Sequence, residues 1–218
     1  MTYAWLFTDK LSSDDASLVP AESLGLEAFR GVIDALNYAR GPFLHRVKMN
    51  GLIANNNARL LAYQRTTIWS SDVTDILRAC ARHWAGDVAG LWNAPPVVCE
   101  YLKTGHEELR AAAEKIAGDA HNSAQLRLYG PNKHKASEAE IAADHAVNAA
   151  WAAIAYAPVA DYAAHVAATN AAFAKACVIS HDGCWSRCWR ESRKFVCEQQ
   201  EKHIVDMVLN LRFSEEFS

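Results

Sequence analysis

The chain has 218 residues, 22 Lys+Arg against 25 Asp+Glu, a formal net charge of −3, and 51% apolar residues. This length is typical of one large domain or two small ones, and the seven Trp, seven Tyr and seven Phe argue against a disordered chain. The slight excess of acidic residues makes nucleic acid an unlikely partner, because phosphate affinity depends on clustered Lys and Arg.

The sequence also bears on the compartment. Met1–Leu6 is followed by Asp9, with no basic leader and no apolar segment of signal-peptide length. The longest uncharged run in the apolar middle, residues 146–160, has 15 residues and is mostly alanine. A membrane span needs roughly 20 apolar residues. We therefore expect a cytoplasmic protein without a membrane segment, whose six cysteines are reduced thiols.

The first 70 residues predict the order strand, helix, strand, strand. The aromatic run Tyr3–Thr8 indicates a strand. From Ser23 onward, apolar residues recur at intervals of three and four, which predicts an amphipathic helix that ends at Gly41-Pro42; the stripe consists of Leu26, Phe29, Ile33 and Leu36.

A hairpin follows this helix. In Leu44–Ile53, His45, Val47 and Met49 alternate with Arg46 and Lys48, which is the pattern of a strand. Asn55–Asn57 predicts a turn, because Asn tolerates positive φ, and Leu60–Trp69 supplies the return strand.

The composition changes near residue 70, where we place a domain boundary. Of the 66 residues from Ala111 to Ala176, 26 are alanine, the residue with the highest helix propensity. The chain is thus expected to be α+β and predominantly α, with a small strand–helix–hairpin module (1–70) followed by an alanine-rich multi-helix bundle (71–218).

Capping and breaking residues divide the bundle into helices. Ser71 or Asp72 can cap the first helix, and Pro95-Pro96 ends it and starts a short helix that stops at Gly105. Further helices are expected over 107–128, from a Ser137–Glu140 capping box to Pro158, from there to about 181, and over 184–211. Since alanine offers little area to bury, larger side chains should anchor the packing: Trp84, Trp92, Trp151, Tyr156, Tyr162, Phe173, Trp185 and Trp189.

One cluster of residues has the chemistry of a zinc site. Cys177, His181, Cys184 and Cys188 share one face of a continuous helix, and thiols and imidazoles bind zinc. Eleven helical residues span about 16 Å, too far for one ion with Zn–S bonds of about 2.3 Å. Only a chain reversal at Asp182-Gly183 could gather four ligands. We expect no metal and no cofactor, and interpret these cysteines as small buried apolar residues.

No catalytic constellation stands out. Asp144-His145 and His181-Asp182 are neighbours in sequence, so on a helix their side chains point apart. The chain has no Gly-x-Ser-x-Gly elbow, phosphate-binding Gly-rich loop or His-Glu-x-x-His pair. We therefore expect a protein that is not an enzyme.

The segment 185–194 combines two Trp with four basic residues, and Trp and Arg are enriched in protein interfaces. Trp185, Arg187, Trp189 and Arg190 are the candidate partner-binding residues. The alternative is that the two Trp, four residues apart, are core anchors and the basic residues a solvated face.

Several stretches resemble a family of bacteriophage and prophage proteins of unknown function. Leu44–Gly51 and Arg59–Arg65 resemble the paired strands of its small N-terminal module, which keeps a helix where Leu26–Ala39 stands. The helical region that follows resembles this chain in residues 76–81, 91–92, 96–98 and 101–105. The alanine-rich tail, with Gln200–His203 and Met207, is similar to helical immunity proteins. The resemblance implies a phage or prophage origin and a bacterial cytoplasm, and it brings no catalytic residues.

The leading hypothesis is a non-enzymatic phage accessory protein that binds a host or defence protein. One alternative is an enzyme or small-ligand binder that uses the N-terminal module, with His45 or Tyr63 near a cleft; another is a structural virion component. Close-packing alanine faces also suit a homo-oligomer.

Overall fold

The computed structural model describes residues 2–11, 16–18, 25–56, 58–131, 136–179 and 185–216, without the side chains of 16–18, 185–189 and 211–216. The chain divides into two compact units. The first comprises Met1–Ile76 and Ile204–Ser218, and the second comprises Leu77–His203. This division differs from the expected 1–70 and 71–218, because the C-terminal segment groups with the N-terminal module.

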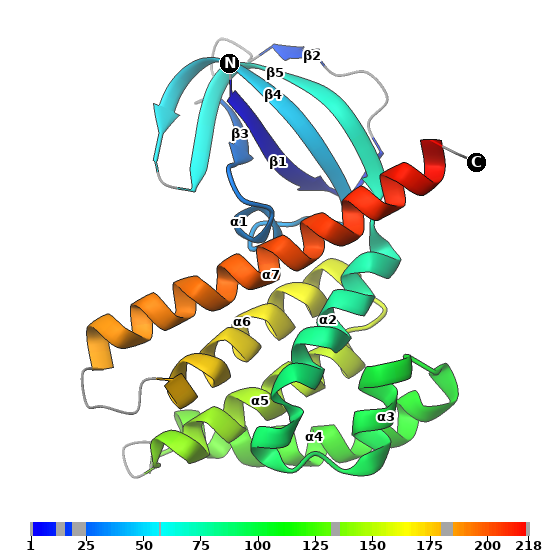
Figure 1. Cartoon of the computed structure of the whole chain (residues 1–218), viewed down its shortest axis with the longest axis vertical. Coiled ribbons are helices and arrows are strands. Elements are labelled where there is room, and N and C mark those ends of the chain that lie inside the picture. Colours follow the sequence, from blue (N-terminus) through cyan, green and yellow to red (C-terminus); the bar gives the residue numbers. More distant parts are fainter. Residues whose placement is uncertain are drawn as a thin grey trace. The chain divides into compact units, whose positions relative to one another are not determined.

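The first unit is built on an antiparallel sheet (Figure 1). Its strands are β1 (Thr2–Thr8), β2 (Ala16–Leu18), β3 (Leu26–Phe29), β4 (Phe43–Asn55) and β5 (Arg59–Asp72). β1 pairs with β3 and β4, and β5 pairs with β4, β3 and β2. Strands β1, β4, β5 and β3 therefore form a closed ring of pairings, which leaves few free strand edges.

The predicted hairpin is confirmed as β4 and β5. The Asn56 side-chain oxygen accepts hydrogen bonds from the backbone N–H groups of Ala58 and Arg59, at 3.3 and 2.7 Å. Asn57 lies outside the described residues. The alternation in β4 is also as expected: His45, Val47 and Met49 are buried, while Arg46 and Lys48 are partly exposed.

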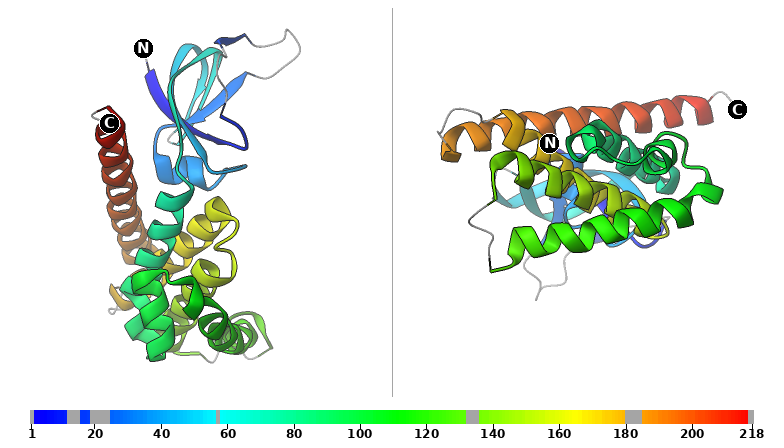
Figure 2. Two further views of the ribbon diagram at one scale, coloured as in Figure 1. Left: turned by 90° about the vertical axis from the view of Figure 1, so that its right-hand side faces the viewer. Right: turned by 90° about the horizontal axis from the view of Figure 1, so that it is seen from below.

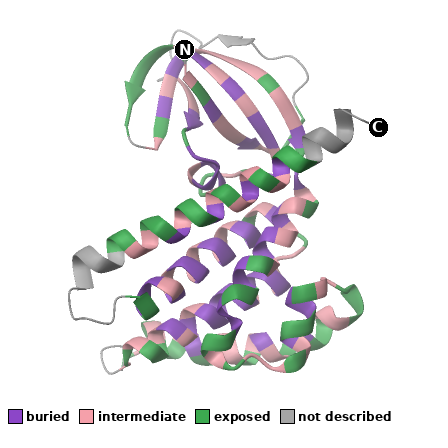
Figure 3. Cartoon of the chain, viewed as in Figure 1, coloured by how far each residue is buried: buried purple, intermediate pink, exposed green. Residues whose placement is uncertain are grey.

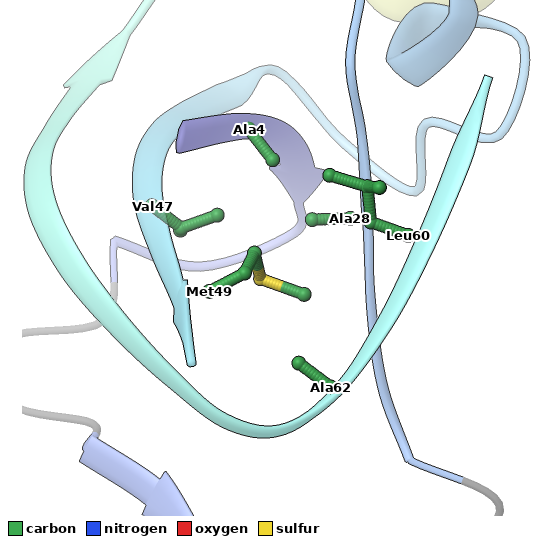
Figure 4. Close-up of a cluster of buried hydrophobic side chains, with 6 residues drawn as sticks. All are labelled: Ala4, Ala28, Val47, Met49, Leu60 and Ala62. Atoms are coloured by element: carbon green, nitrogen blue, oxygen red, sulfur yellow. The ribbon is translucent and has the colours of Figure 1, made fainter. Parts of the chain in front are cut away.

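The interior of the ring is filled by a cluster of six apolar side chains (Figure 4), namely Ala4, Ala28, Val47, Met49, Leu60 and Ala62. Three of the six are alanines, one each from β1, β3 and β5. Because four strands enclose little space, side chains of this size allow the opposite walls to approach closely.

The helix expected from Ser23 to Gly41-Pro42 is wrong over most of its described part, which begins at Gly25. Leu26–Phe29 forms β3 and pairs with β5, and only Val32–Leu36 is helical (α1). Gly31, in an extended conformation at φ −99° and ψ 148°, separates the two elements. The three- and four-residue spacing was misleading because Phe29, Ile33 and Leu36 are buried from a strand and a short helix in succession.

The second unit is helical, so the α+β, predominantly α fold class is confirmed. Its elements are α2 (Thr74–Val88, whose first turn groups with the first unit), the 3₁₀ helix η1 (Ala89–Trp92), α3 (Pro96–Thr104), α4 (Glu107–Tyr129), α5 (Glu138–Ala155), α6 (Ala160–Ile179) and α7 (Trp185–Glu216, which passes into the first unit at Ile204). Within this unit α4, α5 and α6 pack side by side in that order (Figure 2).

The expected helix boundaries are confirmed at three places. Asp72 accepts a hydrogen bond from the backbone N–H of Thr74 at 2.9 Å, at the start of α2. Gly105 ends α3 with φ +69°, a conformation that favours glycine. Ser137 and Glu140 form the capping box of α5.

Much of α5 and α6 is buried (Figure 3), and alanines rather than large anchors make up most of their buried residues. Ala146, Ala150, Ala163 and Ala167 are all fully buried. Among the expected anchors Trp84 is buried, but Tyr162 is 48% exposed, so its expected anchoring role is wrong. Small side chains let the two helices approach closely along most of their contact, and the stacked rings of His145 on α5 and Phe173 on α6 also lie between them.

Among the described residues, no helix combines the length and apolar character that crossing a bilayer requires.

Candidate functional site

An aromatic–arginine row crosses three strands on the outer face of the first unit. Arg46 on β4 is paired in register with Trp5 on β1 and with Trp69 on β5. Directly opposed residues on neighbouring strands have side chains on the same face of a sheet. The buried Val47, one position after Arg46, belongs to the interior cluster, so the row lies on the outside.

Arg46 is held in this row by aromatic rings. The guanidinium carbon lies 4.3 Å from the centroid of the Trp5 ring and 5.8 Å from that of Tyr3. Within the described part of the chain, Arg46 has no carboxylate partner. Burial lowers the pKa of the guanidinium from its ordinary value, and the Tyr3 hydroxyl partly opposes this shift. Arginine nevertheless stays protonated at neutral pH, so the row presents a cation among rings.

A hollow of about 220 Å³ lies at the row. Trp5, Arg46 and Trp69 form one wall, and Val205, Val208 and Leu209 of α7, which belong to the same unit, form the other. Guanidinium N–H groups bind carboxylate or phosphate oxygens, while rings and aliphatic side chains bind apolar groups. The hollow can therefore hold a ligand in which a carboxylate or phosphate group lies next to an apolar group.

His45 lies inside the same unit and is 1% exposed. Its Nε2 is 2.7 Å from Oγ1 of Thr8, and its Nδ1 is 2.6 Å from Oγ of Ser70. The Thr8 hydroxyl donates to the carbonyl of Lys10, so it accepts from Nε2–H, and the Ser70 hydroxyl donates to Nδ1. Burial, followed by the charge of Arg65, lowers the pKa of His45, while the Lys10 backbone opposes the shift.

The two residues of the alternative hypothesis, His45 and Tyr63, have different environments. His45 is a buried, hydrogen-bonded group, and Tyr63 is 63% exposed. Neither is among the residues that line the hollows described for this chain.

The structure describes the side chain of only one of the four predicted partner-binding residues, Arg190. Trp185, Arg187 and Trp189 are at the start of α7, where side chains lie outside the described residues. Arg190 is exposed. Their role in binding stays a prediction.

The candidate metal ligands are likewise only partly visible. Cys177 is buried near the end of α6, and burial is the main cause that raises the pKa of its thiol. His181 and Cys184 lie outside the described residues, as does the side chain of Cys188. Within the described residues, no three His, Cys, Asp or Glu side chains are grouped so that they could hold a metal ion.

Sequence reasoning missed the row of Trp5, Arg46 and Trp69. Each residue was placed on a strand, and Arg46 was correctly placed on the face opposite His45. The register that brings the three together depends on two pairings, Trp5 with Arg46, 41 positions apart, and Arg46 with Trp69, 23 positions apart. The β4–β5 pairing also contains an irregularity between Arg46 and Val47. The alternation of a single strand does not reveal such a shift.

Comparisons with known proteins found no matching family model, no matching curated protein and no matching solved structure. The resemblance to a phage family therefore stays a prediction.

Proposed function

We propose that this chain is a non-enzymatic protein that acts by binding another protein, and that the aromatic–arginine row is its docking site. The observation that supports this most is Arg46, a partly buried cation without a carboxylate partner among the described residues. A cation in that position is costly unless another group compensates it. A bound partner can supply that group.

The partner that fits is an acidic protein segment. An Asp or Glu carboxylate can accept two hydrogen bonds from Arg46, and an adjacent apolar side chain can pack against Trp69 and Val208. Trp and Arg are the residues that most often dominate binding energy in interfaces. Following the resemblance described above, the partner is a host or defence protein in the bacterial cytoplasm, and the chain is a phage or prophage accessory factor.

The test compares capture by three immobilised proteins: the full chain, Arg46→Ala and Arg40→Ala. Arg40 is an exposed arginine of the same unit and serves as the matched control. We expect the full chain and Arg40→Ala to retain the same partner from a lysate of infected bacteria. Arg46→Ala should bind that purified partner at least 30-fold more weakly, equivalent to about 2 kcal/mol.

Three outcomes would count against the proposal. Equal affinity of the full chain and Arg46→Ala for the partner would exclude the row as the docking site. Failure to recover any partner that a no-protein control lacks would count against a binding function altogether. Detection of the chain in purified virus particles would favour a structural virion component instead.

A further inference from the structure

The second unit contains a larger hollow, of about 410 Å³, between α2 and α3. On α2 it is lined by Ala79, Arg82 and Gly86, which follow one another at helical spacing and so share one face. Gly86 and Ala79 leave space where larger side chains would fill it. A Cβ atom built on Gly86 meets no other atom within 4 Å.

The wall from α3 has both apolar and charged character. Leu102 is almost fully buried beneath the hollow, and Lys103 and Cys99 are exposed at its edge. Pockets of 300–1,000 Å³ with apolar walls and a few polar groups are typical of small-molecule sites.

Two cations face this space without an anionic partner among the residues that the structure describes. Arg82 lies against Gly105, where a Cβ atom would come within 2.6 Å of its guanidinium carbon. Neither Arg82 nor Lys103 has an ion pair or side-chain hydrogen bond to the described residues. The acid of the hollow, Asp87, is already paired with Lys175 at 2.7 Å. The C-terminal end of α3, with its free carbonyl groups, attracts cations such as Lys103, but a carbonyl is not a charged partner.

We propose that this hollow is a second binding site, specific for a small organic anion. Its carboxylate, sulfonate or phosphate group contacts Arg82 and Lys103, and its apolar body packs against Leu102 and Ala79. The proposal concerns the second unit and is independent of the docking site on the first.

The test uses the full chain and two fluorescent probes of similar shape, the anion 8-anilinonaphthalene-1-sulfonate and the neutral N-phenyl-1-naphthylamine. Arg82→Gln combined with Lys103→Gln should weaken binding of the sulfonate at least tenfold and leave the neutral probe within twofold. Gly86→Leu should weaken both probes at least tenfold, because its side chain occupies the hollow.

Gly86→Leu also keeps the test interpretable. Leucine has a higher helix propensity than glycine and its Cβ meets no neighbour, so the variant should melt at or above the temperature of the parent chain. Gly90→Ala is the matched control, since Gly90 is equally open but does not line the hollow. A loss of sulfonate binding below tenfold in Gly86→Leu or in the double variant overturns the proposal.

Cys99 provides a second readout in the unmodified chain. Its exposed thiol lies at the hollow, whereas Cys80 and Cys177 are buried. Saturating sulfonate probe should slow alkylation of Cys99 by N-ethylmaleimide at least fivefold, measured by peptide mass spectrometry. The same probe should give no protection in Gly86→Leu, and protection of equal size in both proteins contradicts binding in the hollow.

Discussion

His45 shows at the scale of single residues how the first unit accommodates a buried polar group. Its two ring nitrogens each meet one hydroxyl, of Thr8 and of Ser70, so both are hydrogen-bonded inside the unit. A protonated ring would be a cation buried away from water and would also face the charge of Arg65. The fold therefore selects the neutral form of this histidine.

This selection predicts acid sensitivity. The pKa of His45 is lowered in the folded state, mainly by burial, so between the folded and unfolded pKa values the unfolded chain binds more protons. Stability should be fully present above about pH 6.5 and decline as the pH falls below it. Urea unfolding at pH 7.5 and 5.0 measures the loss. The His45→Gln variant should lose less stability between these two pH values than the parent does. Part of the loss should remain, because burial also lowers the pKa of His145 and of His165. If both proteins lose the same free energy of unfolding, His45 does not contribute to the acid sensitivity.

Asp144 on α5 is a buried carboxylate of the second unit. Its side chain is 1% exposed, and both of its oxygens lie 3.0 Å from Nε of Arg127, itself 49% exposed. Arg127→Ala should lower the free energy of unfolding by about 3 kcal/mol, because it leaves a buried carboxylate unpaired. In a double-mutant cycle with Asp144→Ala, the coupling should be about 1–3 kcal/mol. The exposed pair Arg110–Glu107 is the control, with an expected coupling of about 0.5 kcal/mol or less. Equal couplings for the two pairs would contradict this interpretation.

At the scale of elements, the sequence predicted helix limits correctly where they depend on contacts within a few residues. The capping box of Ser137 and Glu140 and the Pro96-to-Gly105 limits of α3 depend only on neighbouring backbone, and both were predicted. The segment from Leu26 to Phe29 has a helical spacing of apolar residues, yet it is a strand because its backbone pairs with residues of β5 that are 30 to 36 positions away. A distant partner overrides a local pattern in this way when it satisfies the backbone and buries the same side chains.

The contact between α5 and α6 makes the role of alanine testable. Ala167 on α6 is fully buried, and most buried residues of α5 and α6 are alanines, so a larger side chain must displace its neighbours. Ala167→Leu should lower the free energy of unfolding by about 1–3 kcal/mol. Ala139→Leu, on the exposed face of α5, should change it by less than about 0.5 kcal/mol. Thermal or urea unfolding of both variants provides the measurement, and an Ala167→Leu protein as stable as the parent would show that there is unfilled space around Ala167.

At the scale of the whole molecule, sequence reasoning located the change from strands to helices near residue 70, and the first unit continues to Ile76. It did not anticipate that the chain from Ile204 onward groups with the N-terminal module. Composition cannot show this, because a single amphipathic stripe runs along α7 from one unit into the other. Which neighbour a stripe packs against is determined by the tertiary structure, and Ile204 and Val208 are buried without any local sign of their partner.

This grouping predicts the effect of shortening the chain. Burying an aliphatic side chain stabilises a fold by about 1.5–3 kcal/mol. A chain that ends at His203 loses two such contributions, from Ile204 and Val208. This loss is a large part of a typical domain stability of about 5–15 kcal/mol. Hydrogen exchange in peptides from β4 and β5 should become faster, while peptides from α5 and α6 keep their protection. A chain that ends at Asn210 retains both residues and is the control for truncation itself. If the chain ending at His203 exchanges in β4 and β5 as slowly as this control, the segment beyond His203 contributes nothing to the first unit, and the division at residue 70 with the whole tail in the bundle describes the protein better.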